Sequence, residues 1–340
     1  MLTMLKELCD LHGVASFEDD VRSYIQAKAR SCAGGLRVDA MGNLIVFKQG
    51  AQRGQNKLLL TAHMDEAGLI IRDITDEGYL KFAPVGPLDA RVVIGKKVSV
   101  GWSRVPGVVG LKAYHLVSEE EEKVVPKLSD MYIDIGARSR EEAEALVSRG
   151  DYAAFSTRAE EFGAGLLKAK ALDSRIGCAV LLQLLEEDLP MDCTFAFTVQ
   201  EGVGARGAFG AAFSVAPDIA LTVEGVSAAD IPGSDAPRGS VKLGKGPVLA
   251  AMDGGTVYDR ALFELIRSTA EKDGTPWQLR PPVTALNDAS AVQRTREGVR
   301  VAAIAAPVRY ARTPSGLVSV TDYEQTCALV RKSVEAIAAL

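Results

Sequence analysis

The hydrophobic pattern alternates between strand-like and helix-like segments at the start of the chain and throughout its second half. "KLLLTAH" (57–63) is a continuous apolar run, typical of a strand buried on both faces of a sheet. Comparable runs follow at 193–200, 218–225 and 300–308, and helical periodicity occurs at 173–187, 205–215, 258–274 and from about 322 onward. This alternation predicts an α/β domain.

The pattern changes from about Leu69 to about Ala137. Short β-rich runs such as "GLIIRDI", "GYLKFAPV" and "RVVIGKKVSV" recur between Gly, Pro and Asp residues, with almost no helical periodicity. This pattern is typical of a small β-barrel. We therefore predict one discontinuous α/β domain, residues 1–66 and 161–340, and an inserted β-barrel domain, residues 67–160.

Composition narrows the choice of partner and compartment. The chain has 340 residues, enough for two domains, and its net charge of -5 argues against nucleic acid or an anionic membrane as the main partner. No apolar run is long enough to span a bilayer, and charged residues interrupt the apolar start of the chain, so a signal peptide is not expected. Five widely spaced cysteines without a C-x-x-C motif predict reduced, mostly buried thiols in a cytoplasmic protein.

The stretch "TFAFTVQEGVGARGAFG" (194–210) fits two kinds of site. Gly202, Gly204 and Gly207 form G-x-G-x-x-G after a strand-like run, and Glu224 lies where a dinucleotide-binding fold places its ribose-binding acid. The same stretch also places Glu201 at the end of a strand, where a hydrolase keeps a general base. The motif alone does not decide between the two.

Candidate catalytic groups collect at the ends of predicted strands. His63 ends the run 57–63, and Asp65 follows in a His-x-Asp pattern that suits a metal-binding imidazole with an orienting acid. The alternative is a hydrogen-bonded histidine at the sheet edge. Asp173, Glu201 and Glu224 occupy comparable positions. Histidine and carboxylates together suit Zn²⁺, Mn²⁺ or Co²⁺.

Many segments, in order along nearly the whole chain, resemble the tetrahedral (TET-type) metallo-aminopeptidases with their glutamyl and deblocking aminopeptidase relatives. They include "LTAHMDEAGLII", "KALDSRIGCAVLL", "TVQEGVGARGA", "LGKGPVLAAMDGGTVYD" and "RYARTPSG". The resemblance implies a zinc-peptidase-like α/β/α sandwich with a small β-barrel inserted after the His-x-Asp strand. It also implies two neighbouring metal ions and dimers that assemble into a hollow dodecamer.

The resemblance further implies roles for individual residues. His63, Asp173 and Glu224 would bind one metal ion, with Asp173 bridging to a second. Asp65 would orient the site, and Glu201 would act as the general base.

This sequence departs from the family pattern around the second ion. Gly202 stands where the family has a second glutamate, and Arg312 stands where it has a histidine. Both missing groups would bind the same ion, so we expect at most one Zn, Co or Mn ion per chain. Asn287, where threonine is usual, is a smaller change. The G-x-G-x-x-G motif then arises from the change to Gly202, and its glycines are expected to serve turns and packing.

Arg312 cannot replace a metal ligand, because a guanidinium keeps its proton and offers no lone pair. It could take the place of the cation beside Asp173, or bind a ligand carboxylate or a developing oxyanion. Alternatively, it only neutralises a site that has lost its function.

Two classes of function therefore stay open. The first is a metal-dependent aminopeptidase-like hydrolase acting on peptides or small amides, with Glu201, Asp65 and Arg312 as catalytic residues. The second is a non-catalytic paralogue that serves as a scaffold or small-molecule-binding protein. In either case we expect a homo-oligomer built from dimers and no nucleic-acid or membrane partner.

Overall fold

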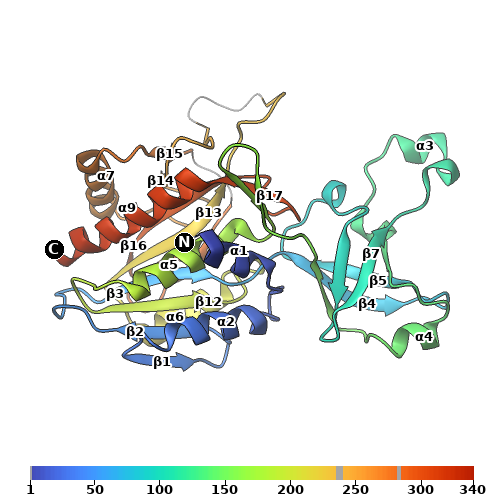
Figure 1. Cartoon of the computed structure of the whole chain (residues 1–340), viewed down its shortest axis with the longest axis horizontal. Coiled ribbons are helices and arrows are strands. Elements are labelled where there is room, and N and C mark those ends of the chain that lie inside the picture. The colour runs from blue at the N-terminus through green and yellow to red at the C-terminus, as the bar shows by residue number, and fades with distance from the viewer. Residues whose placement is uncertain (1, 235–239, 282–284) are drawn as a thin grey trace.

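The chain folds into a large α/β body and a smaller β-barrel that extends from one side of it (Figure 1). The structure, a computed structural model, describes residues 2–234, 240–281 and 285–340. Within these residues, no helix combines the length and the apolar character needed to cross a membrane.

The α/β body is built on a sheet whose central strands are parallel. The order β12–β3–β13–β16 places β3 (Leu58–His63) between β12 (Cys193–Thr198) and β13 (Ile219–Ser227), with β16 (Arg300–Arg309) beyond β13. These strands are buried almost throughout, as the continuous apolar runs predict. Antiparallel strands extend the sheet on both sides: β1 (Gly35–Val38), β2 (Leu44–Lys48), β17 (Gly316–Ser319), β11 (Leu166–Ala169) and β10 (Glu160–Phe162), while β14 (Val248–Ala250) and β15 (Gln278–Arg280) branch from β16.

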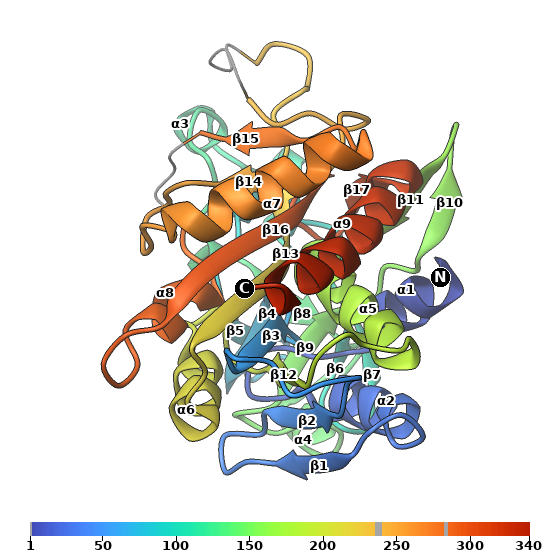
Figure 2. The ribbon, with the colours of Figure 1, turned by 90° about the vertical axis from the view of Figure 1, so that its left-hand side faces the viewer.

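Helices cover both faces of this sheet, which confirms the predicted α/β/α sandwich (Figure 2). One face carries α1 (Leu2–Asp10), α2 (Asp19–Ala29), α5 (Leu172–Glu186), α7 (Arg260–Asp273) and α9 (Val320–Ala338). The other face carries α6 (Arg206–Val215) and α8 (Asp288–Gln293). Local capping fixes where several of these helices begin. The Ser319 hydroxyl accepts the Asp322 amide at the start of α9, for example.

The inserted segment forms a closed barrel of six antiparallel strands in the order β4–β5–β8–β7–β6–β9. The strands are β4 (Gly68–Ile74), β5 (Leu80–Val85), β6 (Lys97–Val100), β7 (Val105–Gly110), β8 (Tyr132–Asp134) and β9 (Tyr152–Phe155). Their inward side chains form a separate hydrophobic core. Short helical segments lie at its periphery: η1 (Ala90–Val92), η2 (Tyr114–Leu116), α3 (Glu119–Glu122), η3 (Leu128–Asp130) and α4 (Arg140–Glu144). The barrel predicted from the sequence is thus confirmed; its exact domain boundaries stay a prediction.

A connection of only four residues, 64–67, joins β3 of the α/β body to β4 of the barrel. The connection is anchored to the N-terminal segment, because the Glu66 amide donates to the Gly13 carbonyl and the Gly13 amide donates to the Glu66 carboxylate. At the first barrel residue, Gly68, a Cβ atom would lie 2.4 Å from a Val14 methyl group and 3.0 Å from the Ala153 carbonyl oxygen. The junction is therefore tightly packed.

Candidate active site

The predicted site residues meet at the carboxyl ends of the parallel strands. His63 is the last residue of β3 and pairs in register with Thr198 at the end of β12, and Glu201 follows three residues later. Glu224 lies on β13, and Asp173 lies at the start of α5. Parallel strands bring their carboxyl ends to one edge of the sheet, which is where open α/β folds bind ligands. His63, Asp65, Asp173, Glu201 and Arg312 all line one pocket there.

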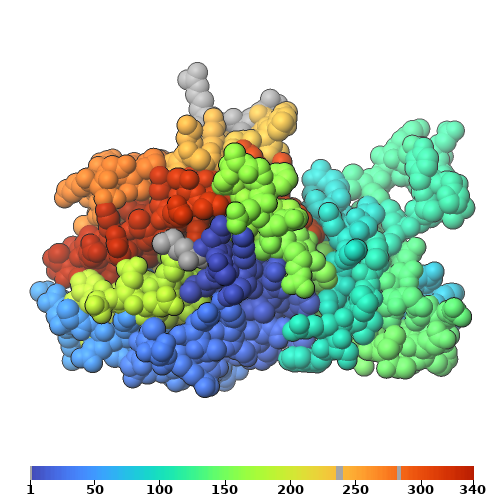
Figure 3. All heavy atoms as spheres, in the orientation of Figure 1, coloured from blue at the N-terminus to red at the C-terminus, as the bar shows by residue number. Residues whose placement is uncertain are grey.

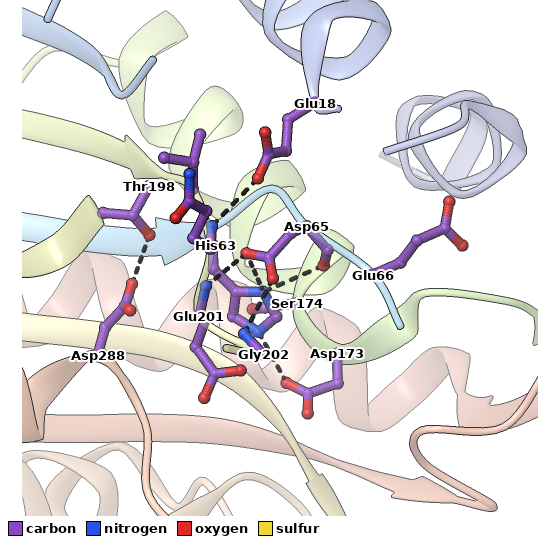
Figure 4. Close-up of polar contacts among 12 residues, drawn as sticks. Glu18, His63, Asp65, Glu66, Asp173, Ser174, Thr198, Glu201, Gly202 and Asp288 are labelled. Atoms are coloured by element: carbon purple, nitrogen blue, oxygen red, sulfur yellow. Dashed lines mark hydrogen bonds and ion pairs between the residues drawn. The ribbon is translucent and has the colours of Figure 1, made fainter. Parts of the chain in front are cut away.

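Asp65 holds both His63 and the segment that carries the expected general base (Figure 4). Its carboxylate accepts the backbone amides of Glu201, at 2.8 Å, and Gly202, at 2.9 Å. The Nδ1 atom of His63 lies 3.2 Å from the Asp65 carbonyl oxygen and 3.5 Å from its carboxylate. A proton on Nδ1 is therefore shared with Asp65, and the opposite ring nitrogen faces the pocket.

The opposite nitrogen of His63 faces Asp173. His63 Nε2 lies 3.4 Å from Asp173 Oδ1, and the same oxygen accepts the Gly225 amide at 3.2 Å. Burial opposes a charge on His63, but its contacts with Asp173 and Asp65 outweigh burial and hold the His63 pKa well above its ordinary value. Without a bound cation, an imidazolium between two carboxylates neutralises part of the site.

Glu201 is buried, with 7% of its surface exposed, yet it lines the pocket. Burial raises its pKa from 4.5 to about 8; His63 opposes this rise, and the negative charges of Asp173 and Asp288 add to it. A carboxyl group whose pKa lies near neutrality is suited to general acid–base catalysis.

Glu224 is held by a different set of partners from His63 and Asp173. Its Oε1 atom accepts the Asn287 side-chain amide at 2.6 Å and lies 3.4 Å from Arg280 Nη1. The Asn287 amide also lies 2.9 Å from the Tyr258 hydroxyl, which donates to Asp253 at 2.6 Å. Burial raises the pKa of Glu224 to about 7, and Arg280 and Asn287 oppose that rise.

The arrangement provides two of the three expected metal ligands. The 3.4 Å between His63 Nε2 and Asp173 Oδ1 is about the edge of a tetrahedron whose corners lie roughly 2.1 Å from its centre. The third residue, Glu224, is paired with Arg280. Among the described residues, no group of three or more His, Cys, Asp or Glu side chains is arranged to hold a metal ion. The residues therefore do not fit a three-ligand centre as they stand.

Arg312 borders the same pocket, on the segment after β16. Its Nε atom lies 3.9 Å from Asp173 Oδ2, and its side chain remains 37% exposed. This is a long, partly solvated ion pair, so the guanidinium both faces Asp173 and is accessible from the pocket. This position is compatible with both roles that the sequence leaves open for Arg312, which are neutralising Asp173 and binding a ligand.

Two of the three glycines of the G-x-G-x-x-G motif, Gly204 and Gly207, have the structural roles expected of them. Gly204 adopts a φ of +115°, which only glycine tolerates easily. A Cβ atom on Gly207 would lie 2.3 Å from Asn43 Oδ1 and 2.5 Å from the Val199 carbonyl oxygen. Gly202 differs from both, because a Cβ atom there would meet its closest neighbour, Asp65 Oδ2, at 3.4 Å. There is room at this position for a side chain.

The chain resembles known proteins in both sequence and structure. The sequence profile of the M42 glutamyl aminopeptidases matches residues 42–329. The chain belongs to this family. A protein of Acetivibrio thermocellus is 37% identical over 339 residues, which cover 99% of this chain and 98% of that protein. The lysyl aminopeptidase of Pyrococcus furiosus is 29% identical over 98% of this chain and 96% of its own length.

Solved structures of aminopeptidases resemble nearly the whole chain. An aminopeptidase from the archaeon Desulfurococcus kamchatkensis superposes with a TM-score of 0.92, at 32% identity, over 98% of this chain and 96% of that one. The TET1 peptidase of Pyrococcus horikoshii, described as assembling into a tetrahedron or an octahedral shell, gives 0.86 at 34% identity over 97% and 98% of the two chains. The M42 protein is accordingly assigned to the peptidase class of hydrolases.

Sequence reasoning missed the residues that surround Glu224. Arg280 and Tyr258 received no role, and Asn287 was noted only as a departure from the family pattern. The one available signal is the arginine at the end of the short strand-like segment "WQLR", because a cation in a buried strand requires a partner. The buried pair Lys170–Glu66 beside the pocket was also missed, with Lys170 Nζ 2.6 Å from Glu66 Oε1.

Proposed function

We propose that this M42 protein hydrolyses peptides or small amides and that Glu201 is its general base. The observation that carries the proposal is the linkage through Asp65, which holds both the Glu201 amide and the His63 ring. A base held by its backbone, with a pKa near neutrality and a side chain in the pocket, suits removal of a proton from an attacking water. Asp65 holds Glu201 and His63 in this arrangement, and the Arg312 side chain lines the same pocket.

The metal part of the proposal is at most one Zn, Co or Mn ion per chain, with His63, Asp173 and Glu224 as its ligands. The spacing of His63 and Asp173 supports it, whereas the contact between Glu224 and Arg280 counts against it. Bound there, a divalent ion would supply a water of lowered pKa and would polarise a carbonyl group. The absence of a glutamate at Gly202 and of a histidine at Arg312 supports loss of the second ion.

The substrate part of the proposal follows from Arg312. A protonated amine within about 4 Å of a guanidinium is repelled by several kcal/mol at an effective dielectric constant of about 20. A carboxylate is attracted instead and can accept two parallel hydrogen bonds. The exposed part of the Arg312 side chain therefore favours substrates with an acidic or N-acylated group over those with a free amino terminus.

A second candidate is a non-catalytic small-molecule-binding protein of the same family. The observation that favours it is the absence, among the described residues, of a formed three-ligand group. Glu201 and Asp65 are retained in contact, however, and a binding protein has no need of a buried carboxyl group in this position. Hydrolysis is therefore the better-supported candidate.

The proposal extends to assembly. The relatives described as dodecameric or shell-forming cover the inserted barrel as well as the α/β body. Apolar side chains at the barrel periphery are strongly exposed in this chain, including Tyr114 at 79% and Val124 at 62%. Figure 3 shows the barrel projecting from the α/β body. We infer a cytoplasmic homo-oligomer of dimers that contact through the barrel.

The decisive experiment compares wild-type protein with Glu201→Gln on a panel of peptides, N-acylated peptides and acidic amides. We expect cleavage of at least one class and a loss of roughly 10²–10⁴-fold in kcat for the variant. Glu161→Gln, at an exposed position, is the matched control. Activity that survives Glu201→Gln would exclude this residue as the base, and a protein inactive on the whole panel would favour the binding-protein candidate.

A further inference from the structure

Glu224 and Arg280 form a buried ion pair at the position expected for a metal ligand. The two side chains are only 8% and 9% exposed, with Arg280 Nη1 3.4 Å from Glu224 Oε1. Arg280 is the last residue of strand β15, which pairs with β14 rather than with β13, so only its side chain reaches Glu224 on β13. A buried carboxylate requires a nearby positive charge or donors, and Arg280 supplies the charge that an ion would otherwise supply.

The neighbourhood holds Arg280 in this position only loosely. Its Nη1 atom lies 4.0 Å from Asp253 Oδ2, and its buried Nε has no hydrogen-bond partner among the described residues. The 3.4 Å contact with Glu224 is also long for a charge-assisted hydrogen bond, which is usually about 2.7–2.9 Å. Arg280 thus neutralises Glu224 without the bidentate geometry that would make the pair hard to separate.

The second carboxylate of the expected ligand set has a comparable partner. Asp173 lies 3.9 Å from Arg312 Nε on one side and 3.4 Å from His63 on the other. Both carboxylates therefore face a guanidinium, which cannot lose its proton at working pH and cannot coordinate a metal.

We propose that Arg280 is the resident counter-cation of Glu224 and competes with a divalent ion for that carboxylate. The site then has two alternative states. In one, Arg280 pairs with Glu224. In the other, a divalent ion binds His63, Asp173 and Glu224. Asn287 and Tyr258 stay in place in both, because they bind each other as well as their acidic partners. The inference deepens the metal part of the proposed function and rests on it.

The test is calorimetric titration of chelator-treated protein with Zn²⁺, Mn²⁺ and Co²⁺ in separate runs. Wild type is compared with Arg280→Gln, which keeps polarity but removes the charge. Arg300→Gln is the matched control, because Arg300 also pairs with an aspartate but lies at the opposite end of the strands. We expect weak binding by wild type and by Arg300→Gln, and affinity at least about tenfold higher for Arg280→Gln. Adding His63→Ala to Arg280→Gln should abolish the gain.

Circular dichroism and melting curves establish that each variant is folded. If Arg280→Gln does not fold, Arg280→Met carries the test, because methionine packs well in a buried site and has no charge. We then expect the same gain of at least about tenfold.

The titration results distinguish the competition by Arg280 from the metal and hydrolase proposals on which it rests. Tight binding of one ion by wild type, unchanged in Arg280→Gln, overturns the competition and leaves the metal part standing. Binding by none of the variants overturns both. The hydrolase proposal is judged independently by the Glu201→Gln assay, which measures cleavage rather than metal affinity.

Discussion

The carboxylate of Asp65 accepts the backbone amide of Glu201 at 2.8 Å. Through this bond an acid on the β3–β4 connection determines where the side chain after β12 enters the pocket. The same aspartate contacts His63 Nδ1, so one residue positions two functional groups.

Asp65→Asn is therefore expected to lower kcat while the protein stays folded. The amide keeps an acceptor for only one of the two backbone donors and weakens the orientation of His63. Loss of an orienting partner typically reduces activity about 10–100-fold. Steady-state kinetics should show the effect in kcat with KM nearly unchanged. Asp134→Asn, at an exposed barrel position where the carboxylate accepts the Gly136 amide, is the control, and an equal effect of both variants would remove the positioning role.

The pH dependence of stability reports directly on Glu201. Burial raises its pKa from 4.5 to about 8 in the folded protein. Between these values the unfolded chain binds fewer protons than the folded one, so stability falls as pH rises. In metal-free protein, Glu201→Gln should melt higher than wild type, with a gap that widens from pH 5 to pH 8 by on the order of 2–4 °C. A residual slope is expected, because burial also raises the pKa values of Glu18 and Glu224 to about 7. A constant gap would show that Glu201 is ionised over the whole range.

Arg312 should determine substrate polarity. We expect weak cleavage of leucyl and alanyl anilides and a preference for acidic or N-acylated substrates. Arg312→Ala should reduce that preference about 10–100-fold in kcat/KM, the range expected for loss of a hydrogen bond to a charged group. Arg309→Ala, which breaks a neighbouring ion pair with Asp230, is the control. Efficient cleavage of unblocked substrates at a rate unchanged by Arg312→Ala would contradict this role.

The double variant Gly202→Glu, Arg312→His should take up a further metal ion. The backbone at Gly202 accommodates a Cβ atom with no neighbour closer than 3.4 Å, so the first atom of a new side chain needs no rearrangement of the main chain. Elemental analysis should show one more equivalent of metal per chain than in wild type, and the substrate preference should shift toward free amino termini. Each single variant serves as a control. An unchanged metal content would show that other residues have closed the second site.

Subunit contact through the barrel should depend on its exposed apolar side chains. Light scattering of wild type is expected to give an even-numbered oligomer, and Tyr114→Glu with Val124→Glu should shift it to smaller species. Both residues are more than 60% exposed, so the substitutions leave the barrel core intact. Phe162→Glu, exposed on strand β10 of the main sheet, is the control. A monomeric wild type at micromolar concentration would be incompatible with the assembly.

The hydrophobic pattern predicted the α/β domain and the barrel because both depend on periodic burial, which leaves a direct trace in the order of apolar residues. It also brought His63 and Asp173 to one place, since both follow from strand and helix ends. The partner of Glu224 was not predictable in this way. Arg280 lies on a three-residue strand whose position depends on pairing with β14, a contact without periodic signature.

The β3–β4 connection gives the barrel a direct influence on the site. Four residues, including Asp65, separate His63 from Gly68. Gly68 packs so tightly against Val14 and Ala153 that there is no space for a Cβ atom. A rotation of the barrel would therefore act on the histidine and on both amides that Asp65 holds. If the proposed subunit contact through the barrel forms, a change in that contact would reach the proposed catalytic groups across only four residues.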